Sequence, residues 1–325
     1  MSRITNALYQ YFFRLFCLAR HSPPAGRRDA GPGIGESPPP DLVEQFPNYH
    51  ANASAFRLQS RWLHDQAFQV AAETLQQFVD ERVDVDLAAL RHWMSGPRGA
   101  IFACPHYGPF VGAALLFAAE GTPERPANVF YDAATDVPQN ERFDVLFERF
   151  ERTIKILHNQ PNDLIKAARA LRNKQCISIM FDVVQKPSEC MYVPFFDRLY
   201  PAMGGAAFLA QMSKASIIPA YAVPIPGRRL HIEFGHELRA EDFSRRDKEQ
   251  SIFEMTCALF KDLERQLTAM PWHWIYWGNL RHAPRYADTM IRNEASLRAE
   301  IRRRLQASSQ LLKAAPALRG LLDAG

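Results

Sequence analysis

Gly99-Ala-Ile-Phe-Ala-Cys-Pro-His106 is a short apolar run that ends in Pro-His, and Tyr107-Gly108-Pro109 follows it. A long apolar stretch from Phe110 to Ala119 comes next, so this segment predicts a strand, a turn and a helix. In open α/β sheets, binding and catalytic groups lie where strands end and helices begin. His106 therefore falls where such a fold places its chemistry, at the positive end of the following helix.

The rest of the chain alternates between strand-like and helix-like segments. Short apolar runs predict strands at 128–131, 153–157, 176–181, 217–223 and 230–234. Apolar residues at helical spacing predict helices at 56–78, 87–94, 139–150, 163–171, 203–212 and 251–267. This alternation is typical of the α/β class, and we expect a single domain with a mixed, mostly parallel sheet flanked by helices.

Composition divides the chain into three parts. Residues 1–41 combine a short apolar and arginine-containing segment, which we read as an amphipathic helix, with a linker rich in proline and glycine. Residues 42–285 hold the α/β domain, and residues 286–325 hold a basic amphipathic helix at 296–312. For both terminal helices, packing on the domain and contact with an anionic membrane surface stay open as alternatives.

Charge and cysteine content exclude several classes of protein. The chain has 325 residues and a formal net charge of +4, which is too small an excess to indicate nucleic-acid binding. Its five cysteines are widely spaced without a CxxC pair, so we expect neither a disulfide framework nor a structural zinc site. The histidines lack metal-ligand spacing, and no stretch approaches the roughly 18 to 20 apolar residues of a membrane span. We expect a cytoplasmic protein, with peripheral contact to the inner face of the cytoplasmic membrane as the open alternative.

His106 is the first candidate for chemistry. A neutral imidazole at a strand end, with a backbone fixed by neighbouring proline and glycine, is suited to act as a general base. Cys104 shares a strand face with His106 by the two-residue period, so a Cys–His nucleophilic pair is the alternative. Its position within the strand argues for burial and against a reactive thiol.

Four stretches, taken in order, resemble the bacterial lipid A late acyltransferases, a branch of the lysophospholipid and glycerolipid acyltransferase superfamily. The likeness runs from about residue 58 to residue 280. It is carried by the segment 101–110 around His106, the strand that ends in Asp182, the run from Val193-Pro-Phe-Phe196 through the small-residue helix to the strand at 217–221, and Pro271-Trp-His-Trp-Ile275.

The resemblance implies an acyltransferase that moves an acyl chain from a coenzyme A or acyl carrier protein thioester to a hydroxyl or amine. His106 would be the general base, and the acceptor would be a lipid or a carrier-tethered group. No permanently bound cofactor is implied. The residues implied in substrate binding are Tyr107, Gly108, Arg142, Phe195, Phe196, Gly204 and Gly205.

Several of these residues have an equally plain structural interpretation. Gly204 and Gly205 allow either the close approach of a pantetheine arm or tight helix packing. Phe195 and Phe196 line either an acyl tunnel or the core, and Arg142 either replaces a missing cation or lies on a solvated helix face.

The chain departs from the family pattern in three places. The position five residues after His106, where the family has its acid, holds Val111. Asp132 stands where the family often has an arginine, and Tyr276-Trp-Gly-Asn279 replaces a basic cluster. Three explanations are open: Asp132 or Asp182 orients the imidazole, the acceptor needs no strong base, or the protein binds acyl chains without turnover. The lost positive charges argue against lipid A itself as the acceptor.

Two rival functions follow from these departures. One is a non-catalytic acyl-binding or scaffold protein, and the other is a thioesterase that uses Cys104 or a water activated by His106. A carboxylate within hydrogen-bond distance of the His106 ring favours the enzyme, whereas a ring packed only by apolar groups favours the binder.

Overall fold

The computed structural model describes residues 37–46, 49–131, 140–158, 161–183, 190–243, 247–283, 299, 302–304, 306 and 307. The predicted N-terminal helix, most of the linker and most of the helix at 296–312 lie outside these residues, so the domain limits at residues 41 and 285 stay a prediction. Among the residues described, no helix is long and apolar enough to cross a membrane.

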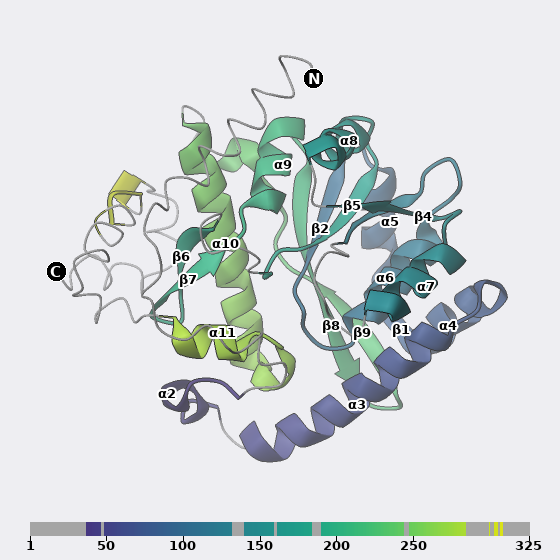
Figure 1. Ribbon diagram of the computed structural model, residues 1–325, viewed down its shortest axis with the longest axis horizontal. Coiled ribbons are helices and arrows are strands. Elements are labelled where there is room, and N and C mark those ends of the chain that lie inside the picture. The colour runs from purple at the N-terminus through teal and green to yellow at the C-terminus, as the bar shows by residue number, and fades with distance from the viewer. Residues whose placement is uncertain are drawn as a thin grey trace.

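A single mixed sheet forms the centre of the domain, as expected (Figure 1). Its strand order is β1 (Val83–Val85), β9 (Arg229–Phe234), β8 (Ser216–Ile225), β2 (Ala100–Cys104), β5 (Cys176–Met180), β3 (Ala127–Phe130) and β4 (Ile154–Leu157), with β10 (Leu238–Arg239) paired to β8. Strands β8, β2, β5, β3 and β4 pair in parallel, while β9 and β10 run antiparallel to β8.

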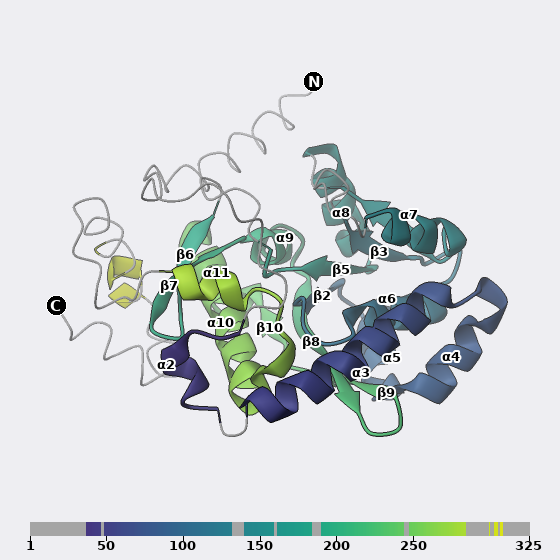
Figure 2. The ribbon, with the colours of Figure 1, turned by 60° about the horizontal axis from the view of Figure 1, so that its bottom comes forward.

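The helices are α2 (Pro40–Val43), α3 (Tyr49–Gln69), α4 (Leu75–Arg82), α5 (Leu87–Ser95), α6 (Phe110–Glu120), α7 (Asn140–Arg149), α8 (Pro161–Arg172), α9 (Gly205–Ser213), α10 (Lys248–Ala269) and α11 (Trp277–His282). Short 3-10 turns are η1 (Ala72–Thr74), η3 (Ala240–Asp242) and η4 (Pro271–His273). The long helix α3 runs along one side of the molecule and contacts α6 and α7 (Figure 2).

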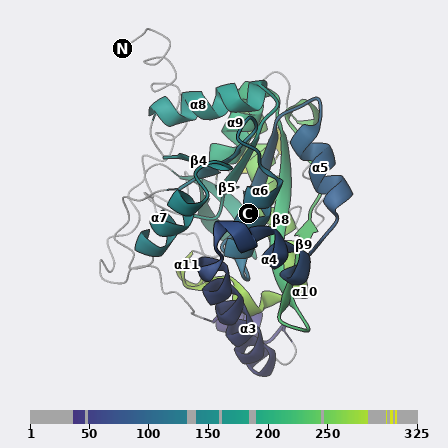
Figure 3. The same cartoon turned by 90° about the vertical axis from the view of Figure 1, so that its right-hand side faces the viewer.

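The sheet separates two apolar cores because neighbouring residues of a strand face opposite sides. On β2, Ile101 and Ala103 join the core beneath α8, α9 and α10, while Phe102 and Cys104 join the core beneath α4, α5 and α6. Helices α8 and α5 lie on opposite sides of β8 (Figure 3). Strand β2 is thus buried on both faces of the sheet, and this is why its sequence is continuously apolar.

The prediction of one helix over 56–78 is wrong. The chain leaves α3 after Gln69 and starts again at Leu75. Ala71 is extended, its N–H donates to Thr74 Oγ1, and the Thr74 hydroxyl donates back to the Ala71 carbonyl. This local turn keeps the apolar spacing while it changes the direction of the chain, so periodicity alone could not reveal it.

The sequence analysis also missed a hairpin of β6 (Met191–Phe195) and β7 (Arg198–Ala202), which lies against α10 and apart from the main sheet (Figure 1). Its turn is Phe196-Asp197, and both residues have positive φ angles of 47° and 58°. Two such residues make the turn that matches the twist of a hairpin. Neither is the glycine that usually marks it, so the sequence carries no clear signal.

The short described part of the C-terminal region packs on α10. The Arg304 guanidinium lies 5.5 Å from the centre of the Phe253 ring, and its side chain is 11% exposed. The Arg304 carbonyl accepts a hydrogen bond from Gln250 Nε2 at 2.7 Å. This arginine of the basic segment is therefore used in packing within the chain.

Gly108 fixes the turn that follows β2. Its φ angle is +58°, and a Cβ atom built on it would lie 1.8 Å from the Ala222 carbonyl oxygen of β8. Only glycine fits both the backbone conformation and this close approach. The turn that carries His106 is thereby pressed against the neighbouring strand.

We expect Gly108→Ala to lower the free energy of unfolding by at least about 1–3 kcal/mol, because the backbone conformation is strained for alanine and the methyl group overlaps a backbone oxygen. The matched control is Gly205→Ala, whose new Cβ would have Ile179 Cδ1 at 3.6 Å as its nearest neighbour. It should change stability by no more than about 1 kcal/mol. Urea unfolding of both variants measures the difference, and equal midpoints would contradict the packing argument.

Candidate active site

The sheet register brings His106 and Asp182 together. Strands β2 and β5 are parallel neighbours, and Cys104 is the register partner of Met180. His106 and Asp182 each lie two residues beyond these partners, so they leave adjacent strands at the same height. The carboxyl edge of a parallel sheet is where such a fold gathers its polar groups.

Asp182 contacts His106 through both of its carboxylate oxygens. Asp182 Oδ1 lies 2.8 Å from His106 Nδ1, and Asp182 Oδ2 accepts a hydrogen bond from the His106 backbone N–H at 2.8 Å. The Asp182 side chain is fully buried, whereas the His106 side chain is 17% exposed. One end of the pair is thus shut off from solvent, and the imidazole is the end that substrate can reach.

The hydrogen bonds determine which ring nitrogen is free. Each partner of the Asp182 carboxylate found among the described residues is an N–H group, and a carboxylate only accepts. His106 Nδ1 is therefore the donor, so in the neutral ring Nε2 is the nitrogen that has the free lone pair. A histidine held in this tautomer is ready to take a proton at Nε2 while the carboxylate stabilises the resulting positive charge.

Trp274 supplies the third hydrogen bond to this carboxylate. Its indole Nε1–H donates to Asp182 Oδ2 at 2.8 Å. The same segment of chain is joined to β2, because Tyr107 and Trp274 form an isolated β-bridge and the Ile275 N–H donates to the His106 carbonyl at 3.2 Å. In the sequence, Trp274 is part of the stretch 271–275 that carries the family resemblance, and no pattern there indicates this contact.

Aromatic rings frame the imidazole. Phe110 and Tyr276 each present an edge-to-face contact to His106, with ring centres 5.2 Å and 5.1 Å away. Burial, and then the charge of Asp182, raise the pKa of the Tyr276 hydroxyl. Tyr276 therefore stays protonated at neutral pH and can act only as a hydrogen-bond donor or acceptor.

His64 supports the turn from the other side and was not singled out in the sequence. His64 Nε2 lies 3.0 Å from the Gly108 carbonyl oxygen, and its ring meets Phe110 edge-on at 4.8 Å. Burial lowers the pKa of His64, so this imidazole is neutral near pH 7. Because the carbonyl only accepts, Nε2 is the nitrogen that carries the proton.

In the described part of the chain, neither of the other two positions shows a carboxylate beside His106. Val111, at the position of the family acid, is a fully buried residue of α6. Asp132 lies outside the described residues. Of the carboxylates considered in the sequence analysis, Asp182 is the one for which a contact with the imidazole is found.

Arg142 contacts two residues of α3. Its Nη2 lies 2.9 Å from Asp65 Oδ1, and its guanidinium stacks 4.1 Å from the centre of the Phe68 ring. These contacts join α7 to α3 at the surface of the domain. They correspond to the helix-face interpretation of this residue.

Phe195 lies in the core, and Phe196 lies in the turn of the β6–β7 hairpin. Phe195 is buried, and its ring centre lies 5.5 Å from that of Trp274. Phe196 forms the hairpin turn, and its N–H donates to Glu264 Oε2 at 3.1 Å. Phe195 therefore supports the indole that contacts Asp182.

The two glycines at the start of α9 differ from each other. A Cβ atom on Gly204 would lie 2.6 Å from Met191 Cε, so this glycine allows close packing of α9 on β6. A Cβ atom on Gly205 would meet only Ile179 Cδ1, at 3.6 Å. Packing explains the first glycine, and no steric requirement explains the second.

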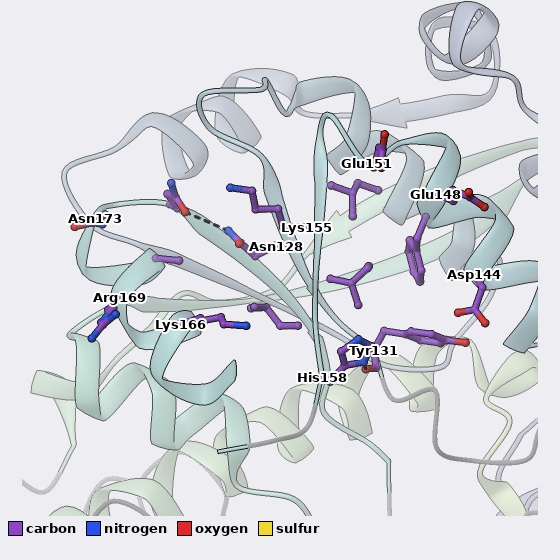
Figure 4. A pocket seen from close by; sticks show the side chains of 16 residues that line it. Asn128, Tyr131, Asp144, Glu148, Glu151, Lys155, His158, Lys166, Arg169 and Asn173 are labelled. Carbon is purple, nitrogen blue, oxygen red and sulfur yellow. Dashed lines mark hydrogen bonds between the residues drawn. The ribbon is translucent and has the colours of Figure 1, made fainter. Parts of the chain in front are cut away.

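A separate groove of about 750 Å³ lies at the edge strand β4 (Figure 4). Asp144 and Glu148 of α7 stand on one side of it, and Arg169 of α8 stands on the other. Neither His106 nor Asp182 lines it. Among the described residues, no group of His, Cys, Asp and Glu side chains is placed to hold a metal ion.

Residues 71–277 match the family model of the bacterial lipid A biosynthesis acyltransferases. This range is more than half of the chain and includes His106, Asp182 and Trp274. No curated protein matches the chain.

We expect Cys104→Ala to leave catalytic activity within about twofold of wild type. Burial raises the pKa of the Cys104 thiol to about 12, and its Sγ lies 3.7 Å from Ser178 Oγ within the core. A thiol that stays protonated is a poor nucleophile. Thiol release from acyl thioesters measures the effect, and loss of activity in a folded variant would restore the Cys–His alternative.

Proposed function

The chain belongs to the bacterial lipid A biosynthesis acyltransferase family, and from this we propose that it transfers an acyl chain from a thioester donor to a hydroxyl or amine acceptor. The donor would be acyl-coenzyme A or a phosphopantetheinyl acyl carrier protein. The observation that carries the proposal is the hydrogen bond of 2.8 Å between His106 Nδ1 and the buried carboxylate of Asp182.

The proposed reaction uses His106 as a general base. Nε2 takes the proton of the acceptor O–H or N–H as the acceptor attacks the thioester carbonyl carbon. The tetrahedral intermediate then expels the thiolate, and Nε2 returns the proton to the sulfur. The acyl chain passes directly to the acceptor, and the imidazole regains its starting tautomer.

Asp182 takes the part of the missing motif acid in this proposal. It holds the ring through Nδ1 and stabilises the imidazolium that forms during proton transfer. Its burial makes that stabilisation stronger, because little solvent screens the interaction. The arrangement supports the first of the three explanations for Val111, with Asp182 rather than Asp132 as the partner.

A row of aromatic rings next to His106 suits the acyl chain. Phe110 stacks on Phe143 at 6.5 Å, and Phe143 in turn contacts Phe68 at 5.0 Å and Tyr131 at 5.9 Å. These rings keep part of their surface exposed. We place the acyl chain along them, because apolar surface next to the base is where a hydrocarbon tail loses contact with water.

The acceptor is proposed to be neutral or tethered to a carrier, and not lipid A itself. Tyr276-Trp-Gly-Asn279 replaces the basic cluster that would meet an acidic phosphosugar, and Arg142 is paired with Asp65. We place the protein in the cytoplasm, where peripheral contact with the inner face of the membrane would bring a lipid acceptor to the site.

We expect His106→Gln and Asp182→Asn each to lower the rate of thiol release by about 10²–10⁴-fold. The assay uses a panel of acyl-coenzyme A and acyl carrier protein thioesters with a cell extract as the source of acceptor. His231 and Asp84 provide a matched control, because they form a second His–Asp pair at 2.9 Å that is exposed on β9 and β1. His231→Gln and Asp84→Asn should leave the rate unchanged.

The same assay separates the rival functions. Release that does not need the extract would identify a thioesterase, and no release from any donor would favour an acyl-binding protein. Efficient acylation of a lipid A precursor would contradict the proposed acceptor class while leaving the proposed base in place.

A further inference from the structure

We infer that Trp274 is a positioning residue, whose indole N–H sets the orientation of the Asp182 carboxylate toward His106. The inference rests on the proposed function for its catalytic consequence, but the contact itself can be tested without substrate. The Trp274 indole N–H donates to Asp182 and not to His106, so its effect passes through Asp182.

The argument starts from what holds the carboxylate. Among the described residues, the carboxylate accepts three hydrogen bonds, and two of them come from His106 itself, one from the ring and one from the backbone N–H. With these two alone, the orientation of Asp182 would be set by His106, the residue that Asp182 is proposed to orient. In the described part of the chain, the third bond is the one that comes from elsewhere: Trp274 holds Oδ2 so that Oδ1 faces Nδ1.

Burial makes this donor difficult to replace. Asp182 has no exposed surface, and Trp274 is 1% exposed. Water therefore cannot take over the hydrogen bond when the indole N–H is removed, and the oxygen loses a donor outright. A buried carboxylate with fewer donors binds a proton more tightly.

The indole is itself held by the parts of the fold that the sequence did not predict. Its ring centre lies 5.5 Å from Phe195 of β6, 5.9 Å from Tyr200 of β7 and 5.1 Å from Trp277 of α11. The β6–β7 hairpin thus acts as a support for the donor. This gives the hairpin, which is not part of the main sheet, a role at the active site.

The departure from the family motif explains why such a donor is needed. An acid five residues after the histidine would lie in the same strand–turn–helix unit, so local geometry would orient it. Val111 occupies that position, and Asp182 comes from a different strand. Its direction must therefore be set by a contact from elsewhere, and Trp274 makes that contact.

The test compares Trp274→Phe with Trp277→Phe. Both changes remove an indole N–H and keep an aromatic ring in the same buried cluster. Trp277 is the matched control because its Nε1–H donates to the Pro271 carbonyl at 2.9 Å and not to Asp182. Each variant should unfold at a similar urea concentration, since each loses one buried hydrogen bond.

Kinetics provide the first readout. In Trp274→Phe we expect kcat for thiol release to fall by about 10–100-fold with KM unchanged, because a lost charge-assisted hydrogen bond is worth about 1.5–3 kcal/mol. Trp277→Phe should keep both kcat and KM, because its indole N–H donates to Pro271.

A second readout needs neither activity nor a folded Trp274→Phe variant. The chain has five tryptophans, so indole ¹⁵N labelling yields five Nε1–H signals in an NMR spectrum. In the full-length protein, Asp182→Asn should shift the signal of Trp274 and leave that of Trp277 in place, because only the former donates to the changed side chain.

The outcomes separate the inference from the proposed function. Equal kinetics for the two tryptophan variants would overturn the positioning role. So would a Trp274 Nε1–H signal that keeps its position in the Asp182→Asn variant. If the His106 and Asp182 variants keep full thiol release while the Trp274 signal shifts as expected, acyl transfer by this pair is wrong but the contact stands.

Discussion

A buried carboxylate is the constraint on which the rest of this structure depends. Asp182 has no exposed surface, so its negative charge must be met by hydrogen bonds from within the protein. Three N–H groups meet it, two from His106 and one from Trp274. To bring them together, the fold has to align β2 with β5 and lay the segment around Trp274 across the end of β2. An error in either arrangement would leave a buried charge without partners.

Burial also sorts the protonation states around His106. The pKa of the Cys104 thiol and that of the Tyr276 hydroxyl are raised, so both groups stay protonated, while the pKa of His64 is lowered, so that its imidazole stays neutral. Each of these groups therefore keeps a fixed form near pH 7. His106 differs in its contacts, because the Asp182 carboxylate lies 2.8 Å from Nδ1 and the side chain is 17% exposed. Among these groups, His106 is the one that we propose as the base.

The two halves of the fold contribute different things to the site. The main sheet supplies His106 and Asp182 at the ends of adjacent strands, and Gly108 presses the turn between β2 and α6 against β8. The β6–β7 hairpin, α10 and α11 supply a cluster of rings around Trp274. The first half places the His106–Asp182 pair, and the second surrounds Trp274, which we infer orients the carboxylate. A chain with Val111 at the position of the motif acid thus still brings a carboxylate to the imidazole.

The sequence by itself determined the α/β class, the strands of the parallel part of the sheet and the position of His106, because a run such as 99–106 is apolar only when both of its faces are buried. The family resemblance pointed to Asp182 as well, although it left Asp132 as an equal candidate. Tertiary structure brings Asp182 to the imidazole, since strand order sets which strand ends are neighbours and no local pattern encodes that order, while Asp132 lies outside the described residues. Tertiary structure also decided the break after Gln69, the hairpin at Phe196 and the contact of Trp274 with Asp182. Each of these depends on groups far apart in the chain or on a turn whose geometry has no glycine to mark it. Hydrophobic periodicity carries no information on either.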